Sequence, residues 1–121
     1  MLDSLFKPKS IAVIGASNNP LSIGHIVIQN LVDHNFQGPI YPINPKSPFI
    51  KSFKTYPTVA HVPDEIDLVN ISIKNTLVPA VLEDCGKKGV KFAIVHTSGF
   101  KEVGQEGLRL EKQIVEIAHK Y

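Results

Sequence analysis

Residues 10–46 read SIAVIGASNNPLSIGHIVIQNLVDHNFQGPIYPINPK, an order that predicts a strand, a glycine turn, a helix and a second strand. Residues 10–15 are mostly apolar and β-branched and end in Gly15, which is typical of a strand buried on both faces. The second strand ends at Asn44-Pro45-Lys46. Spacings of three and four predict that the helix turns one stripe of residues to the core: Ile23, Ile26, Val27, Asn30 and Leu31.

The alternation of strand and helix patterns continues along the chain. Residues 67–73 (DLVNISI) predict a second strand of the buried type, and residues 91–96 (KFAIVH) predict another strand. The helix between them is expected to begin at a Thr76 cap, with Pro79 in its first turn, and to end at Gly89. Its predicted apolar stripe consists of Val78, Leu82 and Cys85.

A last helix is predicted over residues 104–121, and it is expected to bury Leu110, Ile114, Ile117 and Tyr121. Four prolines in residues 45–63 exclude a long helix there, and residues 53–56 could add a short edge strand. Strands that alternate with helices predict an α/β fold, a Rossmann-like parallel sheet with helices on both faces. A crossover helix normally leads into another strand, and none is predicted after this one. We therefore expect either that the helix closes the fold or that the chain was cut from a longer protein and its sheet lacks the last strand.

Size and composition indicate one globular domain that comprises residues 1–121, with 43% hydrophobic and 20% charged residues. A net charge of +2 without a Lys/Arg cluster argues against a nucleic-acid partner. The N-terminus has no signal-peptide pattern and no apolar run reaches the length of a membrane span. The single cysteine, Cys85, suits a reducing compartment. We therefore expect a cytoplasmic protein that binds neither nucleic acid nor membrane.

The glycine turn after the first strand predicts a phosphate site. A strand that feeds a helix through such a turn aims backbone N–H groups and the positive end of the helix dipole at one point. A dinucleotide fingerprint would place a glycine at Ser17 and an acid after the second strand, where Lys46 stands instead. Because a lysine attracts a phosphorylated ribose, coenzyme A or NADP is favoured over NAD. NADP sites usually keep the glycine spacing, so coenzyme A is preferred.

A third polar segment, Thr97-Ser98-Gly99, follows the strand at residues 91–96 and could line the same crevice, although Gly99 could serve only the turn. Lys46 has an alternative interpretation as a solvated loop lysine. Ser22 could simply cap the helix.

The histidines and the cysteine predict no metal site and no catalytic residue. The five histidines form no i, i+4 pair and have no Cys-x-x-Cys partner. For His25 and His96, which are nearest the predicted crevice, ligand binding and a purely structural role stay equally open. Cys85 lies on an apolar helix stripe, so we interpret it as a small buried hydrophobe.

Four blocks of the chain resemble a known family: IAVIGAS with its polar loop and helix, GPIYPINPK, YPTV…VPDEIDLVNISI and LEDCGKKGVKFAIVHTSGFKEVG. In this order they resemble the CoA-binding domain of NDP-forming acyl-CoA synthetases. That group includes ADP-forming acetyl-CoA synthetase and, more distantly, the α subunit of succinyl-CoA synthetase. Some protein lysine acetyltransferases carry the same module. The resemblance covers residues 2–121.

The resemblance implies a Rossmann-like domain that holds coenzyme A across the carboxyl ends of its strands. Lys46 matches the lysine of the family's Asn-Pro-Lys motif, near the adenosine end of the coenzyme. His96, Thr97 and Ser98 match the segment that contacts the coenzyme toward its pantetheine arm. By position, the turn residues that would border the phosphates are Gly15, Ala16, Ser17, Asn18 and Pro20.

Two departures from the family pattern stand out. The family usually has a Val-Pro pair near the adenine, where this chain has Ile73 and Lys74, and Lys74 could add a phosphate contact. The family also continues into a further strand, a Gly-Pro-Asn-Cys turn and a domain that carries a phosphorylated catalytic histidine. The chain therefore resembles only the first part of the family's protein.

The resemblance implies that in the complete enzyme an acyl phosphate reacts with the thiol of coenzyme A, coupled to NDP phosphorylation through a histidine. This chain would bind the coenzyme and catalyse nothing alone, and its partners would be the remaining domains or subunits.

Several alternatives stay open. The chain could be a free-standing CoA-binding or acyl-CoA-sensing module, or the CoA domain of a protein acetyltransferase. It could also be an NAD(P)-binding oxidoreductase or redox-sensor domain, or an interaction scaffold. A missing last strand would leave an apolar surface uncovered, so we expect a truncated chain to self-associate as a homo-oligomer.

Overall fold

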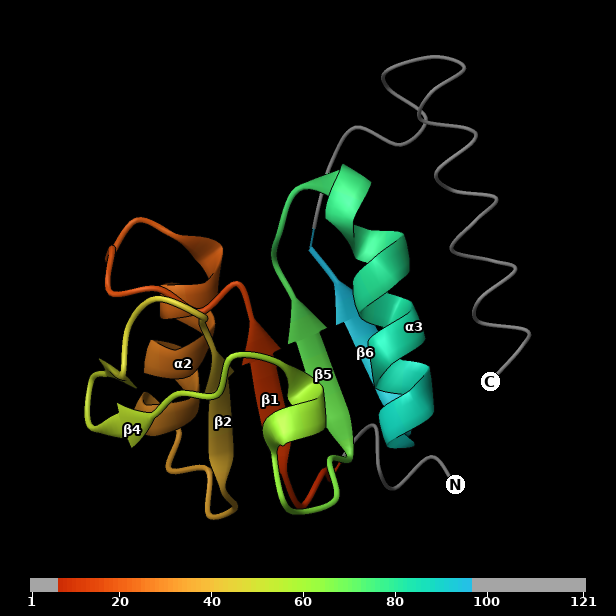
Figure 1. Cartoon of the computed structure of the whole chain (residues 1–121). Coiled ribbons are helices and arrows are strands. Elements are labelled where there is room, and N and C mark those ends of the chain that lie inside the picture. The colour runs from red at the N-terminus through yellow and green to blue at the C-terminus, as the bar shows by residue number, and fades with distance from the viewer. Residues whose placement is uncertain (1–6, 97–121) are drawn as a thin grey trace.

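Four parallel strands form the central sheet, in the spatial order β2-β1-β5-β6 (Figure 1). They are β1 (Ile11–Ile14), β2 (Ile40–Ile43), β5 (Leu68–Ile71) and β6 (Phe92–Val95). The computed structural model describes residues 7–96, so the helix expected over residues 104–121, with Thr97 and Ser98, lies outside the described part. The predicted α/β class and the parallel sheet are confirmed.

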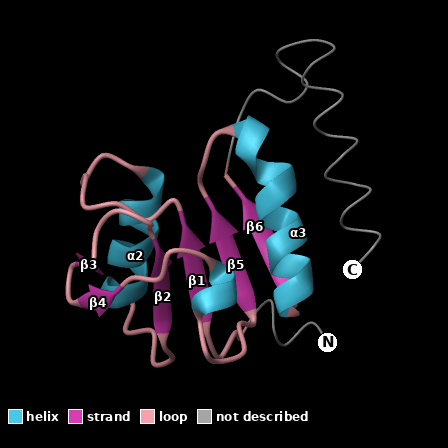
Figure 2. Ribbon diagram, in the orientation of Figure 1, coloured by secondary structure: helices cyan, strands magenta, loops and turns pink. Residues whose placement is uncertain are grey.

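Two helices, α2 (Ile23–Asp33) and α3 (Val78–Lys88), cover opposite faces of this sheet (Figure 2). Successive side chains of a strand point to opposite faces, so β1 contributes to two hydrophobic clusters. Val13 belongs to the cluster that contains Ile28 of α2, and Ala12 belongs to the cluster that contains Val78 of α3. Burial on both faces explains why β1, β2 and β5 are nearly continuous apolar runs, whereas β6 is only partly buried.

The irregular segment between β2 and β5 extends the sheet by a single β-bridge, between Tyr56 and Ile43. It forms a hairpin of β3 (Phe49–Ile50) and β4 (Phe53–Lys54), followed by the short 3-10 helix η1 (Val59–His61). Tyr56 pairs in parallel with Ile43 on the outer side of β2. The edge strand predicted over residues 53–56 is confirmed in part, since residues 53–54 form β4, which pairs with β3. From Tyr56 through β2, β1, β5 and β6 the order is that of a Rossmann fold, with its switch point between β1 and β5.

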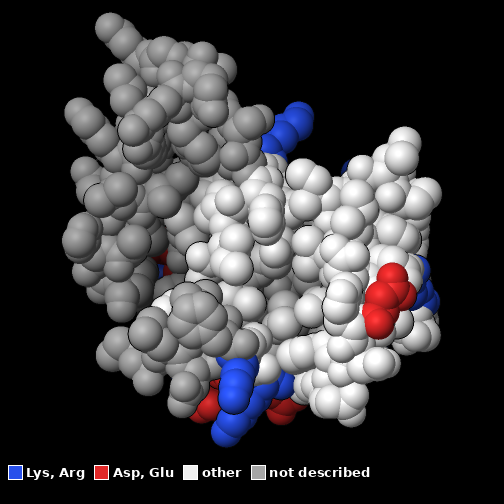
Figure 3. Space-filling view, turned by 180° about the vertical axis from the view of Figure 1, so that it is seen from behind, with Lys and Arg blue, Asp and Glu red and all other residues white. Residues whose placement is uncertain are grey.

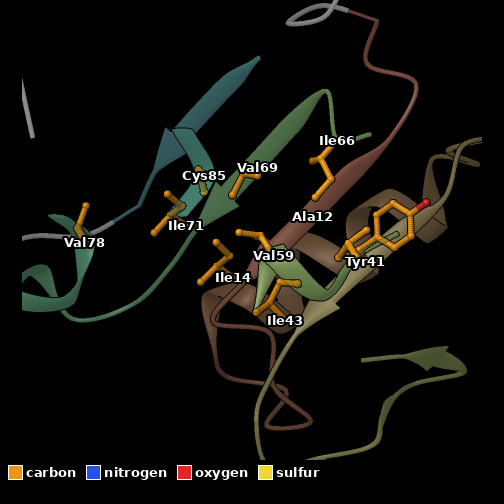
Figure 4. Close-up of a cluster of buried hydrophobic side chains, with 11 residues drawn as sticks. Ala12, Ile14, Tyr41, Ile43, Val59, Ile66, Val69, Ile71, Val78 and Cys85 are labelled. Atoms are coloured by element: carbon orange, nitrogen blue, oxygen red, sulfur yellow. The ribbon is translucent and has the colours of Figure 1, made fainter. Parts of the chain in front are cut away.

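The cluster on the α3 side joins the sheet to η1 and α3 (Figure 4). Its buried residues are Ala12, Ile14, Tyr41, Ile43, Val59, Val62, Ile66, Val69, Ile71, Val78 and Cys85. The predicted stripe of α3 is confirmed, because Val78 and Cys85 are buried and Leu82 packs against the same cluster. Cys85 is a small buried hydrophobe, and burial raises the pKa of its thiol to about 12.

The stripe predicted for α2 is wrong in part. Ile23 and Ile26 are 50% and 45% exposed and Asn30 is exposed, whereas Gly24 and Ile28 are the buried residues. A Cβ on Gly24 would lie 2.2 Å from the carbonyl oxygen of Gly15, so only a glycine lets the helix approach the turn this closely. That contact fixes the rotation of α2. Val27 and Leu31 still pack against the core as predicted.

The opposite side of the molecule from Figure 1 is mostly uncharged among the residues described there (Figure 3). Apolar side chains are also exposed around the first turn of α2, where Leu21 is 86% exposed.

The cap predicted for α3 is also wrong. Thr76 belongs to a separate 3-10 turn, η2 (Asn75–Leu77), and Leu77 takes the cap position without a side-chain hydrogen bond. Pro79 in the first turn and Gly89 at the end are confirmed, and Gly89 adopts the left-handed conformation with φ 85°. The helix therefore continues directly from a 3-10 turn and has no side-chain cap.

Candidate functional site

The turn after β1 lies against the end of β5, at the switch point of the sheet. Gly15 has φ +92°, and a Cβ there would lie 2.1 Å from the carbonyl oxygen of Ser72. The backbone N–H of Ser72 donates to the carbonyl oxygen of Ile14 at 2.9 Å. Two backbone segments thus meet at van der Waals limits, and open α/β sheets bind their ligands at this crevice.

The loop that leads from this turn into α2 is held by its own polar groups. Ser22 caps the helix, because its hydroxyl accepts from the backbone N–H of His25 at 3.2 Å. The hydroxyl of Ser17 accepts from the N–H of Asn19 at 3.0 Å. The Nδ1 of His25 lies 2.9 Å from the carbonyl oxygen of Ser17, a hydrogen bond in the tautomer protonated on Nδ1. His25 therefore fixes the shape of the loop.

Asn44, directly after β2, joins the two loops that border the crevice. Its Nδ2 donates to the carbonyl oxygen of Ala16 at 2.9 Å. Its Oδ1 accepts from the backbone N–H groups of Lys46 at 2.7 Å and Ser47 at 3.0 Å. One side chain thus sets both the path of the glycine turn and the start of the Asn-Pro-Lys loop.

A cavity of about 380 Å³ opens between this edge of the sheet and the start of α3. Its lining is mostly apolar, and it comes from the ends of β1 and β2, from the loop after β5, from η1 and from α3. The lining residues are Ile14, Gly15, Ala16, Ile43, Asn44, Pro45, Pro57, Thr58, Val59, Ile73, Leu77, Ala80, Val81 and Asp84. A mainly apolar cavity with few polar groups is the usual form of a small-molecule or cofactor site.

The structure brings only some of the predicted site residues into this cavity. Gly15 and Ala16 line it, and Ile73 lines it where the family resemblance places the adenine. The other predicted residues lie in flanking segments. Ser17, Asn18 and Pro20 belong to the loop before α2, Lys46 and Lys74 are exposed in the loops after β2 and β5, and His96 is exposed at the end of β6.

Hydrogen bonds tie two of these flanking residues to the fold. Asn18 donates from Nδ2 to the carbonyl oxygen of Phe49 at 3.1 Å, which ties its loop to the β3–β4 hairpin. The backbone N–H of His96 donates to the carbonyl oxygen of Ile71 at 2.7 Å, so His96 continues the β5–β6 pairing at the same edge of the sheet. Both residues therefore border the carboxyl end of the sheet, outside the cavity itself.

Sequence reasoning missed three polar residues of this region: Asn44, Thr58 and Asp84. Asn44 could have been found, because an asparagine before a proline at the end of a strand is typical of a side chain that bonds the following backbone. Thr58 and Asp84 carry no such local signal. They reach the cavity only because η1 and α3 pack on the same face of the sheet.

Other kinds of site find no support in the part of the chain that the structure describes. Between residues 7 and 96, no three His, Cys, Asp or Glu side chains are grouped so that they could hold a metal ion. Neither of the two described α-helices is long and apolar enough to cross a membrane.

Comparison with known proteins supports coenzyme A as the ligand of this domain. The alpha subunit of ADP-forming acetate–CoA ligase I from Pyrococcus furiosus is 47% identical over 124 residues, which cover 99% of this chain and 27% of that protein. The structure of acetyl-coenzyme A synthetase 1 from Ca. Korarchaeum cryptofilum, in complex with phosphate and ADP, has a TM-score of 0.93 and 49% identity. This match covers 100% of the present chain and 26% of the Korarchaeum chain.

The chain therefore spans about a quarter of the length of these relatives. A shorter relative, a hypothetical protein from Pyrococcus horikoshii OT3, has a TM-score of 0.72 and 28% identity, and the match covers 95% of this chain and 75% of that one. A family model described as the CoA binding domain matches residues 9–120. These matches confirm the resemblance in the sequence and coenzyme A as the cofactor. The chain belongs to the CoA-binding domain family.

Proposed function

We propose that this chain is the coenzyme A-binding part of a longer ADP-forming acyl-CoA synthetase. The observation that carries the proposal is the crevice at the switch point, where the turn at Gly15 meets an apolar cavity of about 380 Å³. The greater length of the relatives supports further domains or subunits as partners of the chain, since it matches about a quarter of each.

The coenzyme is proposed to bind with its adenine in the cavity and its phosphates over the glycine turn. The apolar lining, which includes Ile73 and Val81, suits a flat base. The turn of Gly15 to Ser17 and the start of α2 offer backbone N–H groups and a positive dipole for phosphate. Lys46 and Lys74 are exposed on the loops after β2 and β5, where they can pair with the ribose 3′-phosphate or the diphosphate.

Acyl transfer itself is assigned to residues outside this chain. The thiol of Cys85 does not line the described cavity, because Cys85 is buried in the core, where burial raises its pKa to about 12. The chain is proposed to bind and orient the coenzyme, and we expect the isolated chain to form no acyl-CoA.

Thermal unfolding with coenzyme A, dephospho-CoA and NAD in parallel tests this proposal. Coenzyme A at a hundredfold excess over its Kd should stabilise the chain by about 2.7 kcal/mol, a shift of several degrees in Tm. Dephospho-CoA should give a smaller shift, because it lacks the 3′-phosphate. Lys46→Ala should reduce that difference, whereas Lys87→Ala, at the far end of α3, should keep it. A shift with NAD and none with coenzyme A would contradict the proposal.

A second candidate is a free-standing module that senses acyl-CoA. It is favoured by one observation, the match to a Pyrococcus horikoshii protein of which this chain covers 75%. A sensor must discriminate acetyl-CoA from coenzyme A by itself, whereas a synthetase domain that holds only the common nucleotide part binds both equally. Calorimetric titration of the chain with each compound separates the two functions.

A further inference from the structure

Asp84 differs from the other polar residues that line the cavity. The polar lining side chains are Asn44, Thr58 and Asp84. Asn44 is fully engaged by three hydrogen bonds to the two loops. The hydroxyl of Thr58 lies 2.7 Å from Nδ1 of His61. Among the residues that the structure describes, Asp84 makes no hydrogen bond or ion pair, and it lines the cavity, where its carboxylate can accept from a ligand.

Helix α3 places this carboxylate at the end of an apolar stripe. The cavity-lining residues of this segment are Leu77, Ala80, Val81 and Asp84, at spacings of three, one and three, which is one face of a helix. The first three offer only apolar surface. A flat ring that lies along this stripe therefore meets a single polar group, at the Asp84 end.

An ionised carboxylate can only accept hydrogen bonds and repels anions. A ring in this cavity must therefore present an N–H donor toward Asp84, and phosphate groups must lie away from it. The glycine turn at Gly15 and Ala16, which also lines the cavity, provides the place for phosphate. Of the groups on the base edge of coenzyme A, the exocyclic amino group of adenine is the donor.

We propose that Asp84 accepts a hydrogen bond from the exocyclic amino group of adenine and so selects adenine as the base of the coenzyme. This inference rests on the proposed function, because it requires that the base of coenzyme A occupies the cavity. Asp84 is then a specificity-determining residue of the domain and takes no part in acyl transfer.

The test compares coenzyme A with etheno-coenzyme A, in which the amino nitrogen is closed into a ring and carries no hydrogen. The 121-residue chain is titrated with each compound by calorimetry, as wild type, Asp84→Ala and Asp84→Asn. Both compounds carry the same phosphates, so the general effect of removing a negative charge cancels in the ratio of their Kd values. The extra ring also weakens binding to every variant alike, so only a change in the ratio reports the hydrogen bond.

We expect Asp84→Ala to lower the preference for coenzyme A over the etheno compound by about threefold to tenfold, the range of one hydrogen bond. Asp84→Asn should retain part of the preference, because its amide oxygen still accepts. Asp33→Ala is the matched control and should leave the ratio unchanged, since Asp33 ends α2 on the other face of the sheet.

Two results would overturn the inference, and they are distinguishable. If wild type and Asp84→Ala both bind coenzyme A with the same ratio of Kd values for the two compounds, Asp84 makes no hydrogen bond to the base and the proposed function still holds. If the wild-type chain binds neither compound, the proposed function fails and this inference fails with it.

Discussion

The two ends of the parallel sheet use polar groups in opposite ways. At the amino ends of β1 and β5, the hydroxyl of Ser10 donates to the carbonyl oxygen of Glu65 and accepts from the N–H of Asp67 at 3.0 Å. The carboxylate of Asp67 accepts from the N–H of Lys9 at 2.9 Å and pairs with Lys91 at 3.4 Å. All of these contacts are between parts of the chain.

At the carboxyl ends, crowded backbone and an open cavity replace this closed network. Gly15 approaches Ser72 so closely that no side chain fits, and the carboxylate of Asp84 borders the cavity. One end of the sheet is therefore closed by contacts within the chain, and the other leaves a cavity where the coenzyme is proposed to bind. Variants at the amino end should change the free energy of unfolding alone, and variants at the carboxyl end should change binding.

The largest effect is expected for Gly15→Ala. The new Cβ would lie 2.1 Å from the carbonyl oxygen of Ser72, in a backbone conformation of φ +92° that already strains an alanine. Strain of about 1–3 kcal/mol and the forced displacement of β5 should abolish coenzyme A binding and lower the free energy of unfolding by several kcal/mol in urea titrations.

Gly89→Ala is the matched control, because Gly89 has a similar φ of +85° but a Cβ added there would meet no atom within 4 Å. It should cost about 1–2 kcal/mol from strain alone and leave binding intact. Equal costs for the two variants would show that crowding at the switch point has no special effect.

Asp67→Asn should come next and should act on stability alone. It weakens the hydrogen bond to Lys9 and removes the ion pair with Lys91, which should lower the free energy of unfolding by about 1–3 kcal/mol. Calorimetric titration should find an unchanged Kd for coenzyme A. A weaker affinity in the folded variant would break the distinction between the two ends.

The pH dependence of the free energy of unfolding provides a second test of the same variant. The N–H of Lys9, followed by Lys91, holds the pKa of the Asp67 carboxyl below its ordinary value, although burial acts in the opposite direction. The folded state therefore binds this proton less readily than the unfolded state, and the stabilisation is present above about pH 4 and lost as the pH falls further. Urea unfolding of Asp67→Asn between about pH 2 and pH 5 should show a flatter pH dependence than wild type.

Asn44→Ala should separate binding from stability at the carboxyl end. The loss of three hydrogen bonds at a partly exposed site should cost about 1–2 kcal/mol of stability. It should weaken coenzyme A binding by about tenfold or more, since both loops beside the crevice lose their connection. Gln29→Ala, which removes only an exposed contact with Asp33, is the control and should change neither quantity. An unchanged Kd in Asn44→Ala would contradict the role of Asn44 in positioning the loops.

The smallest effect is expected for Tyr41→Phe, at the amino end of β2. The hydroxyl of Tyr41 donates to the carboxylate of Asp64 at 2.9 Å, and its loss should cost about 1 kcal/mol at neutral pH. Burial, and then the carboxylate of Asp64, raise the pKa of Tyr41 to about 12. Since the unfolded state ionises near pH 10, wild type should lose stability between pH 10 and 12 more steeply than the variant. Parallel curves would rule out this contribution.

The strands and turns of this fold were predictable because their signals are local. Short apolar runs predicted the four strands of the central sheet, of which β6 is only partly buried, and Gly15 and Gly89 predicted a turn and a helix end. The rotation of α2 was not predictable from its apolar pattern, because the contact between Gly24 and Gly15 outweighs the burial of Ile23 and Ile26.

Only those parts of the candidate site that lie in a single loop directly after a strand were predictable from the sequence. The glycine turn and the Asn-Pro-Lys loop follow single strands, so their place at the carboxyl edge of a parallel sheet follows from topology. Thr58 precedes η1 and Asp84 belongs to α3, and tertiary packing alone brings these two elements to one cavity. The hydrogen bonds at the amino ends of the strands could not be predicted for the same reason, since Ser10 and Asp67 are 57 positions apart in the sequence.

The central place of β1 also shapes how the chain can fold as it is made. Ile11 pairs with Ile40 on one side and with Leu68 on the other, so β1 has one unpaired edge until β5 has been synthesised. Leu68 follows Ile11 by 57 positions, and the synthesis of these 57 residues takes roughly 3 to 11 s at common translation rates. During that interval an apolar strand is open to other chains. Chaperone capture or slow translation between β2 and β5 should therefore decide how much of the nascent protein reaches its native state.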